Sequence, residues 1–146
     1  MSQNGAEILL VEDDPNDVEL TLEALRKHGL ESKVEVARDG AEALQLVFAE
    51  GPYAERRAAD RPKVIVLDLK LPKVGGLEVL RRIRTDERSK HIPVVVLTSS
   101  EQRRDIAQAY ELGANSYAVK PLEFESFAGM ISQMALYWLS VNRTPP

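Results

Sequence analysis

Two short apolar runs, Ile8–Val11 and Val64–Leu67, each lead directly into carboxylates. The first run is followed by Glu12 and Asp13, and the second is followed by Asp68. If the two runs are neighbouring strands, these three carboxylates converge in a small space and repel one another strongly. A hard divalent cation such as Mg²⁺ relieves that repulsion, because Mg²⁺ prefers oxygen ligands. The pattern therefore predicts a Mg²⁺ site at Glu12, Asp13 and Asp68.

Two further stretches end in groups that complement these acids. The apolar residues 94–97 lead into Thr98, which offers a hydroxyl, and Ser116–Val119 leads into Lys120, which offers an ammonium. Carboxylates, a cation site, a hydroxyl and a lysine together are typical of phosphoryl transfer, in which catalysis is mostly positioning and charge neutralisation. A carboxylate can attack phosphorus and form an aspartyl phosphate. Asp68 is the best candidate for that nucleophile, because it stands alone at the centre of the cluster.

Each of these motifs also has a purely structural interpretation. An acidic cluster such as residues 12–14 is by itself more typical of a helix N-terminus than of a metal site. A lone Lys-Pro pair is usually a turn, and a lone Asp after a strand often caps the next helix. All four groups stand at strand ends in the right order, and this combination favours the phosphoryl-transfer interpretation.

The elements that must position these groups alternate along the chain. Short runs bounded by polar residues or Pro predict five strands, at Ile8–Val11, 33–37, Val64–Leu67, 94–97 and Ser116–Val119. Between them lie helical patterns, with start signals at Asp14-Pro15, at Asp39 with Glu42, before Leu77, at Ser99 or Ser100, and at about 123–141. This alternation predicts a doubly wound α/β fold with a five-stranded parallel sheet and helices on both faces. Ligands of such folds bind at the carboxyl ends of the strands, where the acids stand.

The composition excludes several classes of protein. The 146 residues suit one domain, which we expect at 7–141 between tails at 1–6 and 142–146, with no output domain. A net charge of −4 disfavours binding to nucleic acid or to an anionic membrane. The lack of cysteine excludes thiol catalysis, zinc knuckles and iron–sulfur clusters. No run is apolar enough to span a membrane and the start lacks a signal segment, so we expect a cytoplasmic protein.

Taken together, the motifs resemble the receiver domain of bacterial response regulators, over nearly the whole chain. The matching residues are the acid pair Glu12-Asp13, Asp68 in Val66-Leu67-Asp68-Leu69-Lys70-Leu71-Pro72, Thr98, Tyr117 and Lys120-Pro121. The resemblance implies a flavodoxin-like sheet of strand order 2-1-3-4-5. It also implies a switch in a two-component phosphorelay, in which a sensor histidine kinase donates a phosphoryl group to Asp68. Such a protein is not an enzyme in the usual sense, because it catalyses only its own Mg²⁺-dependent phosphorylation and dephosphorylation.

The resemblance also implies roles for the residues around the phosphoacceptor. Mg²⁺ would be held by Asp13, Asp68 and the backbone carbonyl of Lys70, with Glu12 acting through water. Lys120 would pair with a phosphoryl oxygen, and its bond to Pro121 would be cis. Thr98 and Tyr117 would then shift and change a surface made by the fourth helix, the fifth strand and the fifth helix.

The sequence departs from the commonest pattern of the family in three ways. The first acid is Glu12 rather than Asp, which lengthens its reach, and Asp14 adds a third acid that suits a helix cap. In the family, the positions of Lys70 and Ser100 flank the water that attacks the phosphoryl group, so the lifetime of that group stays open.

Three stretches are most similar to single-domain regulators that partner phytochromes: the loop at 51–62, residues 69–73 and the ending at 137–139. This similarity suggests a bacteriophytochrome as the sensor kinase.

The last helix carries more apolar residues than one buried stripe needs. We therefore predict a homodimer or partner surface from residues of this helix and its neighbour: Tyr110, Met134, Tyr137, Trp138 and Val141. A wider contact within the monomer accounts for the same pattern equally well.

The alternative function is a phosphorylation-independent adaptor of receiver fold. A flavodoxin-like cofactor site is excluded because the acids would repel its phosphate, and a Rossmann dinucleotide site because no G-x-G-x-x-G follows the first strand. A phosphatase with an Asp nucleophile would need an acid where Lys70 stands.

Overall fold

The computed structural model describes residues 6–145 of the chain, except the side chain of residue 58. One parallel sheet of five strands lies at its centre, in the order β2-β1-β3-β4-β5. The strands are β1 (Ile8–Val11), β2 (Val34–Ala37), β3 (Val64–Leu67), β4 (Val94–Thr98) and β5 (Ser116–Val119). The predicted strand order is confirmed. The predicted tail at 1–6 lies outside the described residues except for residue 6, as does residue 146 of the predicted C-terminal tail.

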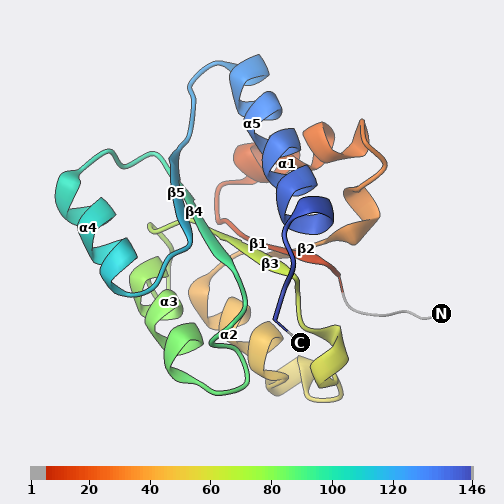
Figure 1. Cartoon of the computed structure of the whole chain (residues 1–146), viewed down its shortest axis with the longest axis vertical. Coiled ribbons are helices and arrows are strands. Elements are labelled where there is room, and N and C mark those ends of the chain that lie inside the picture. The colour runs from red at the N-terminus through yellow and green to blue at the C-terminus, as the bar shows by residue number, and fades with distance from the viewer. Residues whose placement is uncertain (1–5, 146) are drawn as a thin grey trace.

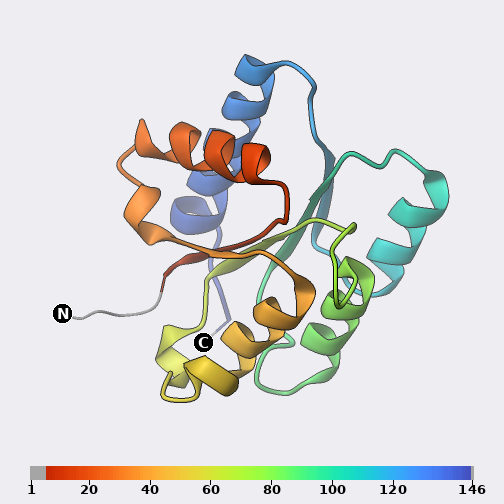
Figure 2. The same ribbon diagram turned by 180° about the vertical axis from the view of Figure 1, so that it is seen from behind.

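Helices cover both faces of this sheet. They are α1 (Pro15–Arg26), α2 (Gly40–Phe48), α3 (Gly76–Thr85), α4 (Arg103–Glu111) and α5 (Phe124–Leu136), and a π-helical turn (Tyr137–Val141) continues α5. Helices α1 and α5 lie side by side on one face, α2 and α3 lie on the other, and α4 stands beside β5 (Figures 1 and 2). The doubly wound fold is thus confirmed. Among the described residues, no helix is long and apolar enough to cross a membrane.

Burial on both faces explains why the central strands are wholly apolar. In β1, Leu9 and Val11 join a core with α2 and α3, whereas Ile8 and Leu10 join a second core with α1 and α5. Strands β3 and β4 are buried in the same way, while every residue of the edge strand β5 is only half-buried. This difference explains why β5 has the weakest apolar pattern of the five.

The predicted helix caps are confirmed at two helices and wrong at a third. Asp14 accepts from the backbone N–H of Asn16 at the start of α1, and Asp39 accepts from that of Glu42 at the start of α2. Helix α4, however, is capped neither by Ser99 nor by Ser100, because it begins later, after Gln102, which makes no side-chain cap bond. The Ser100 hydroxyl instead donates to Asp105 Oδ2 (2.5 Å) and accepts from the Gln102 N–H (3.3 Å).

The start of α3 packs closely against the chain that leaves β3. A Cβ atom on Gly76 would lie 2.3 Å from the Asp68 carbonyl oxygen and 2.6 Å from the Leu69 Cα. The Gly76 N–H donates to the Leu69 carbonyl at 3.0 Å. Only glycine fits here, and its fit places the helix directly behind Asp68.

The loop at 51–62 is held by internal contacts. Arg56 forms an ion pair with Glu35 on β2 and lies over the Tyr53 ring at 5.1 Å. Tyr53 in turn donates to Glu42 Oε2 of α2 at 2.9 Å. These contacts tie the loop to β2 and α2.

The peptide bond between Lys120 and Pro121 is trans. No cis peptide bond occurs in the described chain, so the cis form implied by the family resemblance is wrong.

Candidate phosphoryl-transfer site

Three carboxylates meet at the carboxyl ends of β1 and β3. The two strands pair in parallel with Val11 opposite Leu67, so the residues that follow them emerge at the same edge of the sheet. Glu12, Asp13 and Asp68 each offer one oxygen, and these oxygens lie within 4.8 Å of one another. Glu12 and Asp68 are buried, whereas Asp13 is exposed. The sequence predicted this convergence correctly.

The Lys120 ammonium lies among these acids. Its backbone N–H donates to the Thr98 carbonyl at 2.8 Å, which fixes the chain as it leaves β5. Its Nζ donates to Glu12 Oε1 at 2.7 Å and to Asp68 Oδ2 at 2.9 Å. A third hydrogen bond, of 2.8 Å, goes to Asp17 Oδ2 on the first turn of α1.

Asp17 is the one member of this cluster that sequence reasoning missed. A weak signal was present, because Asp17 follows Asp14 by three residues and therefore lies in the first turn of the helix that Asp14 caps. An acid in that turn is also favoured by the helix dipole alone. Nothing in the sequence therefore distinguished an acid that binds Lys120 from one that only stabilises the start of the helix.

Burial and charge set the protonation of the cluster. Burial, reinforced by the nearby charge of Asp68, raises the pKa of Glu12 to about 7, although Lys120 opposes the shift. Burial alone would lower the pKa of Lys120, but its hydrogen bonds to Asp17, Glu12 and Asp68 raise it above the usual value for lysine. The lysine is therefore fully charged at neutral pH, and the acids are crowded enough to favour an additional cation.

The donor set fits a hard divalent cation. Within residues 6–145, the Asp13 carboxylate has neither a hydrogen bond nor an ion pair, so both of its oxygens are available. Asp68 Oδ1 accepts only a long bond, of 3.3 Å, from the Lys70 N–H. This contact places the Lys70 backbone beside the acids, while the metal-binding role of its carbonyl stays a prediction. Oxygen ligands of this kind suit Mg²⁺ or Mn²⁺.

The two residues predicted to switch both contact Ser100. The Thr98 side chain is fully buried, and its Oγ1 accepts from the Ser100 N–H at 3.4 Å. The Tyr117 hydroxyl donates to the Ser100 carbonyl at 3.0 Å. Since the Ser100 hydroxyl also binds Asp105, a continuous set of contacts leads from the end of β4 to α4.

Comparison with known proteins identifies the family of the chain. The family model described as the response regulator receiver domain matches residues 8–132. The chain belongs to this receiver family. It is thus a response regulator of two-component phosphorelay signalling, as the motifs had indicated.

Several solved receivers resemble this one over almost its whole length. The phosphorylated cyanobacterial phytochrome response regulator RcpA is 39% identical, with 97% of this chain and 99% of that chain covered and a TM-score of 0.89. The bacteriophytochrome response regulator RtBRR is 48% identical, with 97% and 85% covered and a TM-score of 0.75. Rcp1 of Synechocystis sp. is 36% identical, with 94% of this chain and 92% of Rcp1 covered. The Mn²⁺-bound form of Rcp1 matches with a TM-score of 0.86 over 95% of this chain and 98% of that chain.

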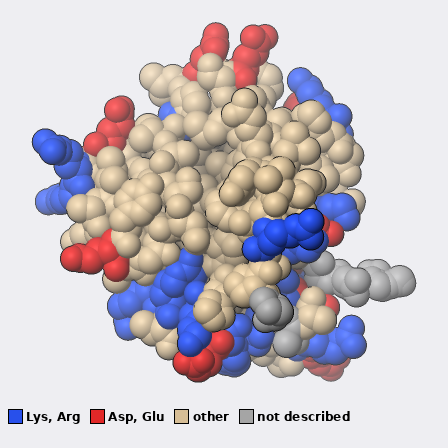
Figure 3. Space-filling view, viewed as in Figure 1, with Lys and Arg blue, Asp and Glu red and all other residues tan. Residues whose placement is uncertain are grey.

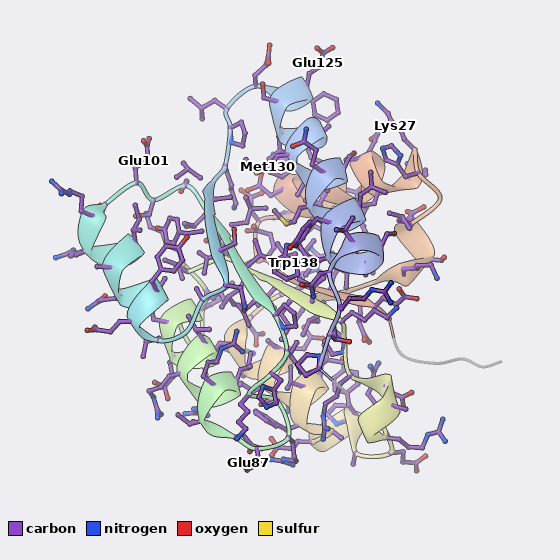
Figure 4. All side chains as sticks on the ribbon, viewed as in Figure 1. Lys27, Glu87, Glu101, Glu125, Met130 and Trp138 are labelled. Atoms are coloured by element: carbon purple, nitrogen blue, oxygen red, sulfur yellow. The ribbon has the colours of Figure 1, made fainter. Side chains whose placement is uncertain are left out.

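The predicted partner surface of the receiver is only partly exposed. Tyr110, Tyr137 and Val141 are open to solvent, at 50%, 47% and 62% of their full exposure. Met134 and Trp138 are instead half-buried and pack against the core beneath α5. Figure 4 labels Trp138 on the π-helical turn that continues α5. Sequence periodicity alone could not separate the buried from the exposed residues of the last helix, because Met134, Tyr137, Trp138 and Val141 all follow helical spacing.

Proposed function

We propose that Asp68 is the phosphoacceptor of this receiver and takes its phosphoryl group from a phosphohistidine of a sensor kinase. An Asp68 carboxylate oxygen attacks phosphorus, the O–P bond forms as the N–P bond breaks, and the imidazole leaves with the electron pair. The observation that carries the proposal is the 2.9 Å contact between Lys120 Nζ and Asp68 Oδ2, beside two further carboxylates. The ammonium is in place to neutralise charge that develops on the phosphoryl oxygens.

The proposed metal is Mg²⁺, held by Asp13, Asp68 and the Lys70 carbonyl, with Glu12 acting through water. Its chemistry when bound is the neutralisation of negative charge shared by the acids and the phosphoryl group. The unpaired Asp13 carboxylate, within the part of the chain that the structure describes, supports this proposal, as does the Mn²⁺-bound form of the similar regulator Rcp1. The buried Glu12 carboxylate is occupied by Lys120 and by the Asp14 N–H, which favours an indirect role for it.

After phosphorylation, Thr98 and Tyr117 transmit the change to the α4–β5–α5 side of the molecule. The Thr98 hydroxyl leaves the Ser100 N–H for a phosphoryl oxygen, and the Tyr117 ring moves inward behind it. Support comes from the contacts of both residues with Ser100, which also binds Asp105 of α4. A small event at the acids therefore biases the position of α4.

The proposed partners are a phytochrome-type sensor kinase in the cytoplasm and a second copy of this chain. The first rests on the similarity to RcpA and RtBRR, which are phytochrome and bacteriophytochrome response regulators. For the second, the surface proposed from the structure comprises the exposed residues Tyr110, Leu136, Tyr137 and Val141. Figure 3 shows that the middle of the face over β5 and α5 carries few charged side chains, whereas Lys and Arg gather at the lower end of the same view. Light scattering with and without beryllofluoride tests the dimer, and a monomeric mass in both states would exclude it.

The phosphoacceptor is tested by labelling with acetyl phosphate and Mg²⁺, followed by intact-mass measurement. We expect one phosphoryl adduct on the wild type and none on Asp68→Asn or without a divalent cation. Asp14→Asn is the matched control, because Asn also caps helices well and the exposed Asp14 side chain hydrogen-bonds only to the start of α1. Failure to label the wild type, with no beryllofluoride-induced change in Trp138 fluorescence, would favour the phosphorylation-independent adaptor instead.

A further inference from the structure

A hollow with a volume of about 310 Å³ lies at the edge of the sheet opposite the acid cluster. Its walls come from three segments, at 61–63, 87–93 and 144–145. The first two segments directly precede β3 and β4, whereas Asp68 and Thr98 stand at the other ends of these strands. The volume lies at the small end of the range of about 300–1,000 Å³ that is typical of ligand sites. The hollow is therefore large enough for a small molecule and separate from the proposed phosphoacceptor.

Basic side chains line this hollow, although the net charge of the protein is −4. Arg61, Lys63 and Arg88 contribute cations and His91 contributes an imidazole. Of the lining residues that the structure describes, only Glu87 is acidic, and its carboxylate pairs at 3.0 Å with a lysine outside the lining. Figure 3 shows Lys and Arg gathered at the lower end of the molecule, and Figure 4 labels Glu87 at the same end. The lining therefore favours an anionic ligand.

Arg61 carries hydrogen-bond donors that nothing in the described chain accepts. Its side chain makes one hydrogen bond within residues 6–145, a long one of 3.4 Å from Nε to the Val47 carbonyl. Hydrogen bonds from Arg88, together with the nearby charge of Arg61, lower the pKa of Asp86, but only Arg88 donates to that carboxylate. The two terminal nitrogens of the half-buried Arg61 are thus available. A guanidinium fork of this kind matches phosphate oxygens.

Two further groups of the lining also have unused donors. Lys63 Nζ makes only a long ion pair, of 3.5 Å, with Glu7, whose carboxylate is shared with Lys33 at 3.2 Å. The exposed His91 imidazole makes neither a hydrogen bond nor an ion pair within the part of the chain that the structure describes. Three of the basic side chains can therefore bind an anion without first losing a hydrogen bond to a carboxylate.

The rest of the lining is apolar. Pro62, Ile92 and Pro93 come from the two segments before the strands, and Pro145 comes from the segment that follows the π-helical turn. Ile92 also packs against the core formed with α2 and α3, which holds this wall in place. Ligand sites commonly combine an apolar wall with a few polar groups that fix orientation. An inorganic anion would use only the basic groups and would leave the apolar wall uncovered.

We propose that this hollow binds a nucleotide, with phosphate oxygens on Arg61, Lys63 and His91 and the flat base against the apolar wall. The phosphates account for the unused donors, and the base accounts for the proline and isoleucine surface. The inference goes beyond the proposed function and does not depend on it. The carboxylates at the opposite edge of the sheet repel the same ligand, so the two sites take different partners.

The test is isothermal titration calorimetry with ADP, pyrophosphate and adenosine. EDTA keeps divalent cations away from the acid cluster, and salt at about 0.15 M screens general attraction between exposed charges. We expect ADP to bind at least about fivefold more tightly than pyrophosphate, which lacks the base, or adenosine, which lacks the phosphates. On addition of ADP, backbone amide resonances at 87–92 should shift, whereas those of Glu12 and Asp68 should not.

Substitution of Arg61 tests the assignment of the phosphate contacts. Arg61→Gln should weaken ADP binding about tenfold, because charge-assisted hydrogen bonds are lost, and Arg61→Lys should lie between this variant and the wild type. Arg104→Gln is the matched control, because it removes the same charge from α4, outside the lining, and should change the affinity less than twofold. Urea unfolding verifies that each variant is folded.

The alternatives give different results. Equal weakening by Arg61→Gln and Arg104→Gln would mean general electrostatic attraction and would overturn the site. Pyrophosphate binding as tight as that of ADP would overturn the assignment to a nucleotide, and so would amide shifts confined to the acid cluster. Absence of saturable binding by all three probes would overturn the inference altogether. None of these results bears on the labelling of Asp68, which tests the proposed function separately.

Discussion

Replacing Lys120 by Met removes the cation while keeping most of the length of the side chain. The ammonium serves two carboxylates that are nearly fully buried, Glu12 and Asp68, and one that is partly exposed. Removal of one partner from a buried ion pair costs about 3–5 kcal/mol. We expect a loss of about 3 kcal/mol in the free energy of unfolding at pH 8 without metal, at the lower end because Glu12 can take up a proton.

The loss should depend on pH, because Lys120 opposes protonation of Glu12. The pKa of Glu12 is about 7 with the lysine present and rises further without it. At pH 6 Glu12 is largely protonated in both proteins, so its interaction with the ammonium matters little there. At pH 8 the wild type holds an ionised Glu12 beside Lys120, whereas the variant must bind a proton or keep an unpaired buried charge. The loss in stability should therefore be clearly smaller at pH 6 than at pH 8.

Urea unfolding in EDTA at the two pH values measures this difference. Lys90→Met is the matched control, because Lys90 pairs with the largely exposed Glu87 and should lose less than about 1 kcal/mol. Mg²⁺ should restore part of the stability of Lys120→Met. A loss below about 1 kcal/mol at pH 8, or equal losses at the two pH values, would refute the idea that the ammonium holds the buried acids together.

Three further substitutions test separate parts of the structure. Glu12→Gln should raise the free energy of unfolding above pH 7 by about 1–3 kcal/mol in EDTA, because the raised pKa of Glu12 means that its charge destabilises the fold there; urea titration at pH 8 checks this. Arg84→Ala should cost about 2–4 kcal/mol in thermal or urea unfolding, since the half-buried guanidinium donates to three backbone carbonyls and one side-chain amide; unchanged stability would contradict this. Gly76→Ala should cost about 2–4 kcal/mol and slow the labelling of Asp68, because its Cβ would overlap the Asp68 carbonyl, whereas Gly75→Ala, with open space around it, should change the midpoint little.

The strands that the sequence predicts most clearly are those buried on both faces of the sheet. The runs at β1, at β3 and at residues 94–97 of β4 are wholly apolar because both of their faces are covered, and four such residues are too few for a helix. Parallel pairing then fixes the convergence of Glu12 and Asp68, since both directly follow paired residues. This part of the site therefore follows from local patterns and one rule of topology.

Other features depend on tertiary contacts that leave no local pattern. Ser100 looks like a helix cap in sequence, but its hydroxyl binds Asp105 and α4 starts later. The predicted last helix changes to a π-helical turn at Tyr137, and Trp138 packs inward. Each outcome was decided by a tertiary contact or by a change in helical period, neither of which hydrophobic spacing encodes.

The contacts of Ser100 are divided between its backbone and its side chain. Tyr117 binds the carbonyl, which every residue type possesses, whereas Asp105 binds the hydroxyl. Ala or Gly at position 100 would therefore remove the hydrogen bond to Asp105 of α4 and keep the hydrogen bond from the Tyr117 hydroxyl to the backbone carbonyl. A single substitution thus separates the contact with Tyr117 from the contact with α4. The coupling between the phosphoacceptor site and α4 can therefore change at position 100 while Asp68 and its neighbours stay the same.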